Sequence, residues 1–399
     1  MPDNLPESLI NIRTEMSEFI KNHLPIERPI ERPIEMPDER PEEDLGESND
    51  EQFSRDNDKL RIDVIKASKE AKFFYKTQAQ AFGGMPATSL ELTMLREQLA
   101  SANSEYSQFV FGPGPGILHK AEGFLKSNYL DPLLNGDKRM AFGFTEPEDA
   151  TRPTYAIIEG EKLTITGRKS YVTGGAAADF IGILVNLEDI HGKKLGTAMV
   201  VVDKDKTGVI IERDFTSMEG GDHLALKFDA VQTHINCIIG KPGEGMPRAL
   251  GNIADVRLMV SAQAMGICIW VNNYLEKKLN SPHRSGQPLG SREGIRLKLA
   301  DLRIETYVAR SALYRTARLV DSKENSVNEI SMTKVFCTEV AGRVVDQAIQ
   351  LCGGQALVLG HPLEKIYRQV RSLRLVEGAN DLLRLNIVKG KFELGLGRL

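Results

Sequence analysis

The chain has 399 residues, of which 41% are hydrophobic and 27% charged, and its formal net charge is −4. This composition is typical of a globular protein long enough for two or three domains. No apolar run approaches the roughly 20 residues that a membrane-spanning helix requires. The N-terminus lacks the charged-then-apolar pattern of a signal peptide and holds too many acidic residues for a transit peptide. The sequence therefore predicts a cytoplasmic protein that makes no contact with a membrane.

The cysteines, the histidines and the distribution of charge argue against a disulfide framework, a metal site and a nucleic-acid partner. The four cysteines are widely spaced without a CxxC pair, and the seven histidines form no HxxxH or HxH motif, so we expect neither a disulfide framework nor a metal site. Residues 25–58 carry 13 acidic side chains and 4 arginines, a balance of −9; subtracting this from −4 leaves +5 for the rest of the chain. That surplus suits a polyphosphate ligand but is too diffuse to predict nucleic acid as a partner.

The first 58 residues predict one helix and an acidic insert. Residues 8–23 place apolar side chains at helical spacing, and a proline at position 25 stops the helix. Five prolines then recur at every fourth position: Pro25, Pro29, Pro33, Pro37 and Pro41. Because prolines at this spacing forbid a continuous helix and the segment is highly charged, we expect an extended, solvated loop over 25–58. It is either a tolerated surface insertion or a docking segment for a partner.

The remainder predicts helices, then strands, then helices. Helical patterns cover 59–74, 89–105 (with Thr88 or Ser89 as the N-cap) and 117–128. Short β-rich runs about ten residues apart fill 140–240, a spacing typical of an antiparallel sandwich or barrel. Long helical segments follow near 245–280, 291–320 and 327–352, joined by short loops as in an antiparallel bundle. We therefore predict an α+β protein with an N-terminal helical domain (1–138), a middle antiparallel β domain (139–243) and a C-terminal four-helix bundle (244–399).

One carboxylate near the C-terminus stands out. An amphipathic helix, with Ile366, Val370 and Leu373 on its apolar face, ends just before Val376. Glu377 then occupies a glycine-marked break before a second helical run, 381–392. Burial in these apolar surroundings would raise the proton affinity of the carboxylate, as a general base near neutral pH requires. Alternatively, Glu377 caps the next helix or pairs with an upstream arginine.

Two further motifs lie in the predicted β domain. In Phe142-Gly143-Phe144-Thr145-Glu146-Pro147, the proline forces Glu146 into an extended conformation, which leaves the Thr145 hydroxyl free to meet a planar ring. The run Lys169-Ser170-Tyr171-Val172-Thr173-Gly174-Gly175 follows a predicted hairpin. The alternatives are the start of a loop for the first motif and a hairpin with a glycine loop for the second.

Together with the order CGG, EKIYR and VEG near the C-terminus, these motifs resemble the acyl-CoA dehydrogenase family over the whole chain apart from the acidic insert. The resemblance implies FAD as cofactor and an acyl-CoA thioester as substrate. It makes Glu377 the base that removes the α-proton, with Arg257 and Gly378 at the substrate. The residues expected to contact FAD are Phe142, Phe144, Thr145, Tyr171, Thr173, Arg284, Gln350, Gly353, Gly354, Ala379 and Asp381.

Several of these roles carry further implications. A Thr173 hydroxyl near the flavin N5 edge would stabilise reduced flavin, and Tyr171 would supply stacking area. Gln350 and the glycine pair reach a neighbouring subunit's FAD in the family, so we expect a homo-oligomer, a dimer or a tetramer. The alternative for Gly353 is a helix C-cap, and for Arg257 a solvated arginine at a helix start. Electrons would leave to an electron-transfer flavoprotein.

Three segments depart from the family pattern: 148–153, 282–285 and 379–381. In the last, Ala379 and Asp381 replace a threonine and a glutamine. These departures leave open a non-catalytic partner subunit with weakened FAD binding. A flavin oxidase or monooxygenase of the same fold is a second alternative, because a sequence does not show whether oxygen reaches the flavin.

Overall fold

The computed structural model describes residues 5–25 and 47–398, with the side chains of 47–58 and 251–255 left aside. The chain forms two compact units. The helical unit comprises Met1–Thr77, Met85–Phe111 and Arg257–Leu399, and the sheet unit comprises Gln78–Gly84 and Gly112–Val256. The N-terminal helices thus belong to the same unit as the C-terminal helices. The division into three domains stays a prediction.

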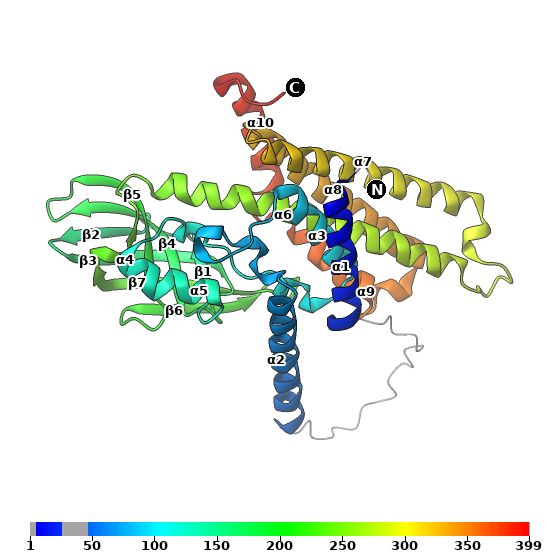
Figure 1. Cartoon of the computed structure of the whole chain (residues 1–399), viewed down its shortest axis with the longest axis horizontal. Coiled ribbons are helices and arrows are strands. Elements are labelled where there is room, and N and C mark those ends of the chain that lie inside the picture. The colour runs from blue at the N-terminus through cyan, green and yellow to red at the C-terminus, as the bar shows by residue number, and fades with distance from the viewer. Residues whose placement is uncertain (1–4, 26–46, 399) are drawn as a thin grey trace. The chain divides into compact units, whose positions relative to one another are not determined.

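The helical unit follows the predicted periodicity closely (Figure 1). Thr88 caps α3, because its hydroxyl accepts a hydrogen bond from the Glu91 N–H at 3.1 Å. Helix α8 is the most buried of the long helices, and it packs against α7, α9 and α10. The bounds are α1 (Glu7–His23), α2 (Glu47–Glu70), α3 (Ser89–Ser101), α6 (Gly245–Asn280, beginning in the sheet unit), α7 (Glu293–Asp321), α8 (Val327–Cys352), α9 (Pro362–Ser372) and α10 (Asn380–Leu394).

One of the predicted boundaries is wrong. Helix α2 already begins at Glu47, so the extended loop expected up to residue 58 does not reach that far. The last proline of the insert is Pro41, so residues 47–58 contain no proline that would interrupt a helix. The part of the insert over 26–46 lies outside the described residues.

The helix predicted over 117–128 is replaced by short turns. These are Gly116–Leu118, α4 (Gly123–Leu125) and the π-turn Lys126–Leu130, followed by α5 (Asp131–Asn135). Gly116, Lys120 and Gly123 have φ values of +50°, +64° and +51°, which no right-handed helix accommodates. The apolar periodicity was read correctly, because Ile117, Leu118 and Leu125 are buried.

The sheet unit holds one eight-stranded sheet in the order β6-β7-β3-β2-β4-β5-β8, with β1 also paired to β4 (Figure 1). Most ladders are antiparallel as predicted, but β1 and β2 both pair with β4 in parallel, so the sheet is mixed. The strands are β1 (Met140–Gly143), β2 (Tyr155–Glu159), β3 (Lys162–Thr173), β4 (Phe180–Asp189), β5 (Lys194–Asp203), β6 (Val209–Thr216), β7 (Asp222–His234) and β8 (Ile238–Ile239).

Both faces of the central strands are buried. Along β4, Ile181 and Ile183 enter one apolar core, whereas Phe180 and Leu184 enter another that includes Leu130. This alternation follows from the two-residue period of a strand. Among the described residues, no helix is long and apolar enough to cross a bilayer.

Candidate active site

Glu377 lies in the turn between α9 and α10. Its φ is +57°, a left-handed value that is uncommon for a residue with a Cβ, and Gly378 follows at +100°. The Nε of Arg257 donates a hydrogen bond to the carbonyl oxygen of Glu377 at 2.9 Å. A Cβ at position 378 would lie 3.3 Å from Nη2 of Arg257, so the glycine leaves room for the guanidinium group. The structure therefore brings Glu377, Gly378 and Arg257 together.

A second cation, Lys334 on α8, holds the other side of this turn. Its Nζ donates to the carbonyl oxygen of Gly378 at 3.0 Å and to Oδ1 of Asn380 at 2.9 Å. The Lys334 side chain is fully buried. Neither Lys334 nor Asn380 was predicted as a site residue.

Burial and the neighbouring charges have opposite effects on the Glu377 carboxyl group. Burial raises the pKa of Glu377 above its usual value, while the positive charges of Arg257 and Lys334 act to lower it. Burial, aided by the nearby Arg257, lowers the pKa of Lys334 to about 8. A carboxylate with raised proton affinity is the kind of group that a general base near neutral pH requires.

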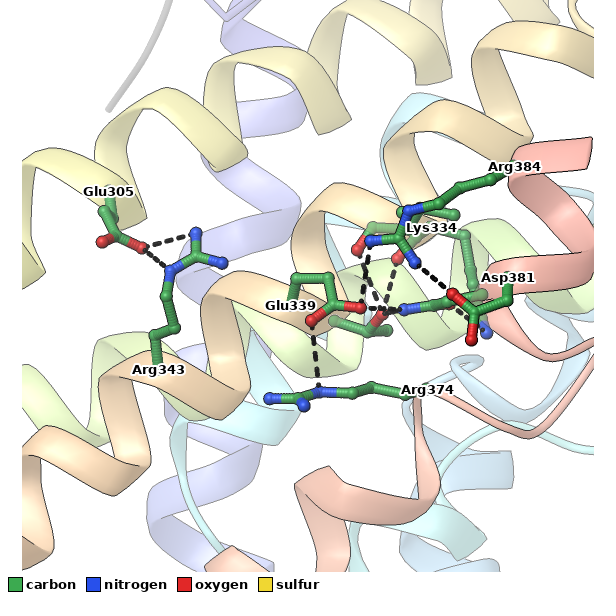
Figure 2. Close-up of polar contacts among 10 residues, drawn as sticks. Glu305, Lys334, Glu339, Arg343, Arg374, Asp381 and Arg384 are labelled. Atoms are coloured by element: carbon green, nitrogen blue, oxygen red, sulfur yellow. Dashed lines mark hydrogen bonds and ion pairs between the residues drawn. The ribbon is translucent and has the colours of Figure 1, made fainter. Parts of the chain in front are cut away.

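An ion-pair network is centred on Glu339 (Figure 2). Glu339 on α8 lies 3.6 Å from Arg374 and 3.3 Å from Arg384, and Arg384 also pairs with Asp381 at 2.9 Å. Although burial acts to raise it, the contacts with Asn380, Arg374 and Arg384 hold the pKa of Glu339 below its usual value. This carboxylate is therefore a fixed negative charge behind the turn.

The sheet unit places the first predicted flavin motif at the end of β1. The rings of Phe142 and Phe144 stack with centroids 6.0 Å apart and an angle of 16°. The Thr145 side chain is exposed, and its carbonyl oxygen accepts a hydrogen bond from the Ser170 N–H at 2.8 Å. That bond joins the first motif directly to the second.

A buried ion pair fixes the same backbone. Nζ of Lys169 donates to Oε1 of Glu146 at 2.8 Å and to the carbonyl oxygen of Phe144 at 3.3 Å. Although burial acts to raise it, the hydrogen bonds from Lys169 and from the Thr154 N–H hold the pKa of Glu146 low. Burial lowers the pKa of Lys169, and Glu146 opposes that change. Sequence reasoning missed this pair, because neither residue belongs to an apolar pattern.

The second motif lies on a β-bulge. The register of β3 against β7 shifts between Lys169 and Val172, and Tyr171 has a φ of +54°. Tyr171 is 64% exposed, and its ring lies edge-on to Phe215 with the ring centroids 5.5 Å apart. The Thr173 hydroxyl lies 3.1 Å from Nδ1 of His223. Phe215 and His223 were not predicted, because they come from β6 and β7, far along the chain.

Segment 148–153, which departs from the family's sequence pattern, is bound to the sheet by ion pairs. Arg168 pairs with Asp149 at 2.9 Å and with Glu212 at 2.8 Å. Arg152 pairs with Glu188 and lies 3.7 Å from the centroid of the Tyr155 ring. This segment is therefore fixed, although it differs from the sequence expected for the family.

The other predicted residues lie apart from Glu377 within the helical unit. Gln350 is 16 residues beyond Lys334 on α8, about 24 Å along the helix axis. A Cβ added at Gly353 or Gly354 would meet no described atom within 4 Å, which leaves their backbone open to a ligand. Gly353 is the C-cap of α8, as the alternative interpretation expects, and its contact with FAD stays a prediction. Arg284 is exposed between α6 and α7.

Two predicted residues follow Glu377 closely. Ala379 is half-buried as the N-cap of α10, and the Asp381 side chain is 96% exposed beside Arg384. Within the sheet unit, the stacked Phe142 and Phe144 and the accessible Tyr171 offer aromatic surface of the kind that a planar ring system contacts. Within the helical unit, the backbone of Gly353 and Gly354 is open to close approach by a ligand.

Comparisons with known proteins support the resemblance to the acyl-CoA dehydrogenase family. A family model described as "Acyl-CoA dehydrogenase, C-terminal domain" matches residues 243–392. An acyl-CoA dehydrogenase of Bacillus subtilis (strain 168) is 30% identical over 280 residues, covering 68% of this chain and 73% of the relative. A 3-(aryl)acrylate reductase of Clostridium sporogenes (strain ATCC 15579) is 26% identical over 335 residues, covering 82% of this chain and 89% of the relative.

Solved structures confirm the predicted α+β fold. The structure of butyryl-CoA dehydrogenase from Megasphaera elsdenii aligns with a TM-score of 0.76 at 20% identity, covering 98% of this chain and 99% of that chain. The chain therefore belongs to the acyl-CoA dehydrogenase family, and it is an FAD-dependent oxidoreductase that acts on the CH–CH group of an acyl-CoA.

Proposed function

We propose that this oxidoreductase converts an acyl-CoA thioester to its trans-2-enoyl thioester, with Glu377 as the base that removes the α-proton. The observation that carries the proposal is the setting of the Glu377 carboxyl group. It lies in a turn of unusual backbone conformation, burial raises its pKa, and two cations bind the carbonyl groups next to it.

Different groups around the turn contribute to proton removal in different ways. An α-proton beside a thioester is too weakly acidic for an isolated carboxylate, so the developing enolate needs a hydrogen-bond donor. Among the described residues, the Glu377 N–H has no acceptor, which leaves it free to bind the thioester oxygen. Arg257 and Lys334 favour the ionised carboxylate that accepts the proton.

FAD, when bound, supplies the acceptor for the hydride that leaves the β-carbon. In the sheet unit, we assign Phe142, Phe144 and Tyr171 to contact with its ring system and the Thr145 and Thr173 hydroxyls to hydrogen bonds at its edge. In the helical unit, we assign Gly378 and Arg257 to the substrate. The remaining FAD contacts are assigned to Arg284, Gln350, Gly353, Gly354, Ala379 and Asp381.

Two proposals concern other proteins. The exposed backbone of Gly353 and Gly354 supports a homo-oligomer in which one subunit reaches the cofactor of another. The exposed ring of Tyr171 beside Phe215 supports an electron-transfer flavoprotein as the acceptor, because exposed aromatic groups are typical of protein interfaces.

The proposal is tested by anaerobic titration of the FAD-loaded protein with acyl-CoAs of different chain length. We expect at least one of them to bleach the flavin absorbance of the native protein. Glu377→Gln should retain FAD but lose the bleaching, because the amide accepts no proton. Glu393→Gln, which changes an exposed glutamate on α10, is the control and should bleach normally. Undiminished bleaching in Glu377→Gln would show that another group is the base.

A further inference from the structure

Lys334 occupies a position that is costly for a lysine. Its side chain is fully buried in the middle of the helical unit. Its two hydrogen-bond acceptors, the Gly378 carbonyl and the Asn380 amide oxygen, are both uncharged. Lysine is almost never fully buried without a charged partner, so its retention here requires another explanation.

Asn380 is oriented to receive this lysine. Its Nδ2 donates to Oγ1 of Thr338 and to Oε1 of Glu339, both at 3.0 Å. Because a carboxylate accepts and an ammonium group donates, the amide has only one orientation that satisfies both Glu339 and Lys334. The backbone N–H of Asn380 donates to the Arg374 carbonyl at 2.9 Å, which closes the turn.

Arg257 and Lys334 donate hydrogen bonds to the carbonyl groups of two consecutive residues. Arg257 binds the carbonyl of Glu377 and Lys334 binds the carbonyl of Gly378, at 2.9 and 3.0 Å. A left-handed conformation at a residue such as Glu377 persists only where its surroundings fix it. These two bonds fix the peptide planes on either side of Gly378, and so they set the direction of the Glu377 side chain.

Few charged groups lie near Lys334 and the Glu377 carboxyl group. The charged groups that face Lys334 are Arg257 on α6, Glu377 in the turn and Glu339 on α8. Glu339 is already paired with Arg374 and Arg384, whereas Lys334 has no ion pair within 4.0 Å among the described residues. The positive charge of Lys334 therefore acts mainly on Glu377.

We propose that Lys334 is a positioning residue of this enzyme: through Gly378 and Asn380 it fixes the turn that carries Glu377, and its charge favours the ionised form of the Glu377 carboxyl group. The proposal rests on the role of Glu377 as the base, but the charge effect is measurable without turnover.

The test is an infrared titration of the FAD-loaded protein. In the native protein, the infrared band of the protonated Glu377 carboxyl group is isolated by subtracting the spectrum of Glu377→Gln. For each Lys334 variant, the same band is isolated by subtracting the spectrum of the double variant that also carries Glu377→Gln. In Lys334→Met and Lys334→Gln we expect the pKa of Glu377 to rise by about one unit, because a nearby cation is lost. In Lys334→Arg, the pKa of Glu377 should lie within about 0.3 pH units of the native value, because the positive charge is kept.

Kinetics then separate positioning from charge. Lys334→Gln should lower kcat by about tenfold or more with little change in KM, because a misdirected base slows chemistry more than binding. The control, Lys389→Met, changes an exposed lysine on α10 and should shift neither quantity. An unshifted Glu377 pKa in both Lys334→Met and Lys334→Gln would overturn the proposal. It would leave the role of Glu377 as base intact, since that role is tested by the bleaching of Glu377→Gln.

Discussion

In the part of the chain that the structure describes, each compact unit buries one lysine, and the two lysines bind different partners. In the sheet unit, Lys169 binds the Glu146 carboxylate and the Phe144 carbonyl. In the helical unit, Lys334 binds a carbonyl and an amide oxygen and, among the described residues, no carboxylate. Both lysines hold the backbone beside a functional motif, but only Lys169 has its charge neutralised by a direct partner.

The difference indicates what each lysine contributes. The ion pair between Lys169 and Glu146 joins the end of β1 to β3. Because its two charges cancel, it has little electrostatic effect on other groups. An ammonium group without a direct carboxylate partner is less favourable for folding, but its charge acts on the nearest carboxyl group, Glu377. Enzymes commonly place such unfavourable charges at active sites, because activity and stability make opposite demands there.

The largest expected effect is on stability. Lys169→Met leaves Glu146 without its cation, and we expect it to lower the free energy of unfolding by about 3 kcal/mol, the low end for a broken buried pair. The low end applies because the Glu146 side chain remains 25% exposed. Lys334→Met should cost only about 1 kcal/mol, because two neutral acceptors lose a donor while an unfavourable buried charge is removed.

Chemical denaturation of both variants measures this contrast. Lys162→Met, at an exposed position on the same strand as Lys169, is the control and should change little. If Lys334→Met proved the more damaging of the two, Lys334 would be a structural tie like Lys169, and the comparison would fail.

A smaller effect concerns pH and Glu377. The pKa of this carboxyl group is raised in the folded protein above its usual 4.5. Its stabilising contribution is therefore fully present below pH 4.5 and is lost as pH rises through the folded pKa. Relative to Glu377→Gln, the native protein should lose stability between pH 4.5 and neutrality.

Denaturation of the two proteins side by side across that pH range checks the sign. A stability difference that stays constant with pH would mean that burial leaves the proton affinity of Glu377 unchanged. The setting of the proposed base would then lack its main physical support.

The sequence could predict the features that depend on local patterns. The helices α8, α9 and α10 follow from apolar periodicity, and the position of Glu377 follows from the break marked by Gly378. The start of α2 at Glu47 and the turns around Lys120 could not be predicted. Residues 47–58 are as highly charged as the rest of the insert, for which an extended loop was expected, and a positive φ at a lysine has no sequence signature.

Lys334 and the pair Glu146–Lys169 could not be found in this way. A lysine within a helical pattern is usually exposed, and its burial depends on packing against residues 44 to 46 positions further along the chain. Likewise, Phe215 and His223 come next to Tyr171 and Thr173 only through the pairing of β3, β6 and β7. Long-range pairing of this kind leaves no local trace.

The most direct test of the central claim is exchange of the substrate α-hydrogen with solvent. The native FAD-loaded protein, incubated in D₂O with an acyl-CoA that binds without being oxidised, should place deuterium at the α-carbon as detected by mass spectrometry. Glu377→Gln should show no incorporation above the uncatalysed rate, although it binds the same ligand. Incorporation at the native rate by Glu377→Gln would contradict the account, because some other group would then be moving the proton.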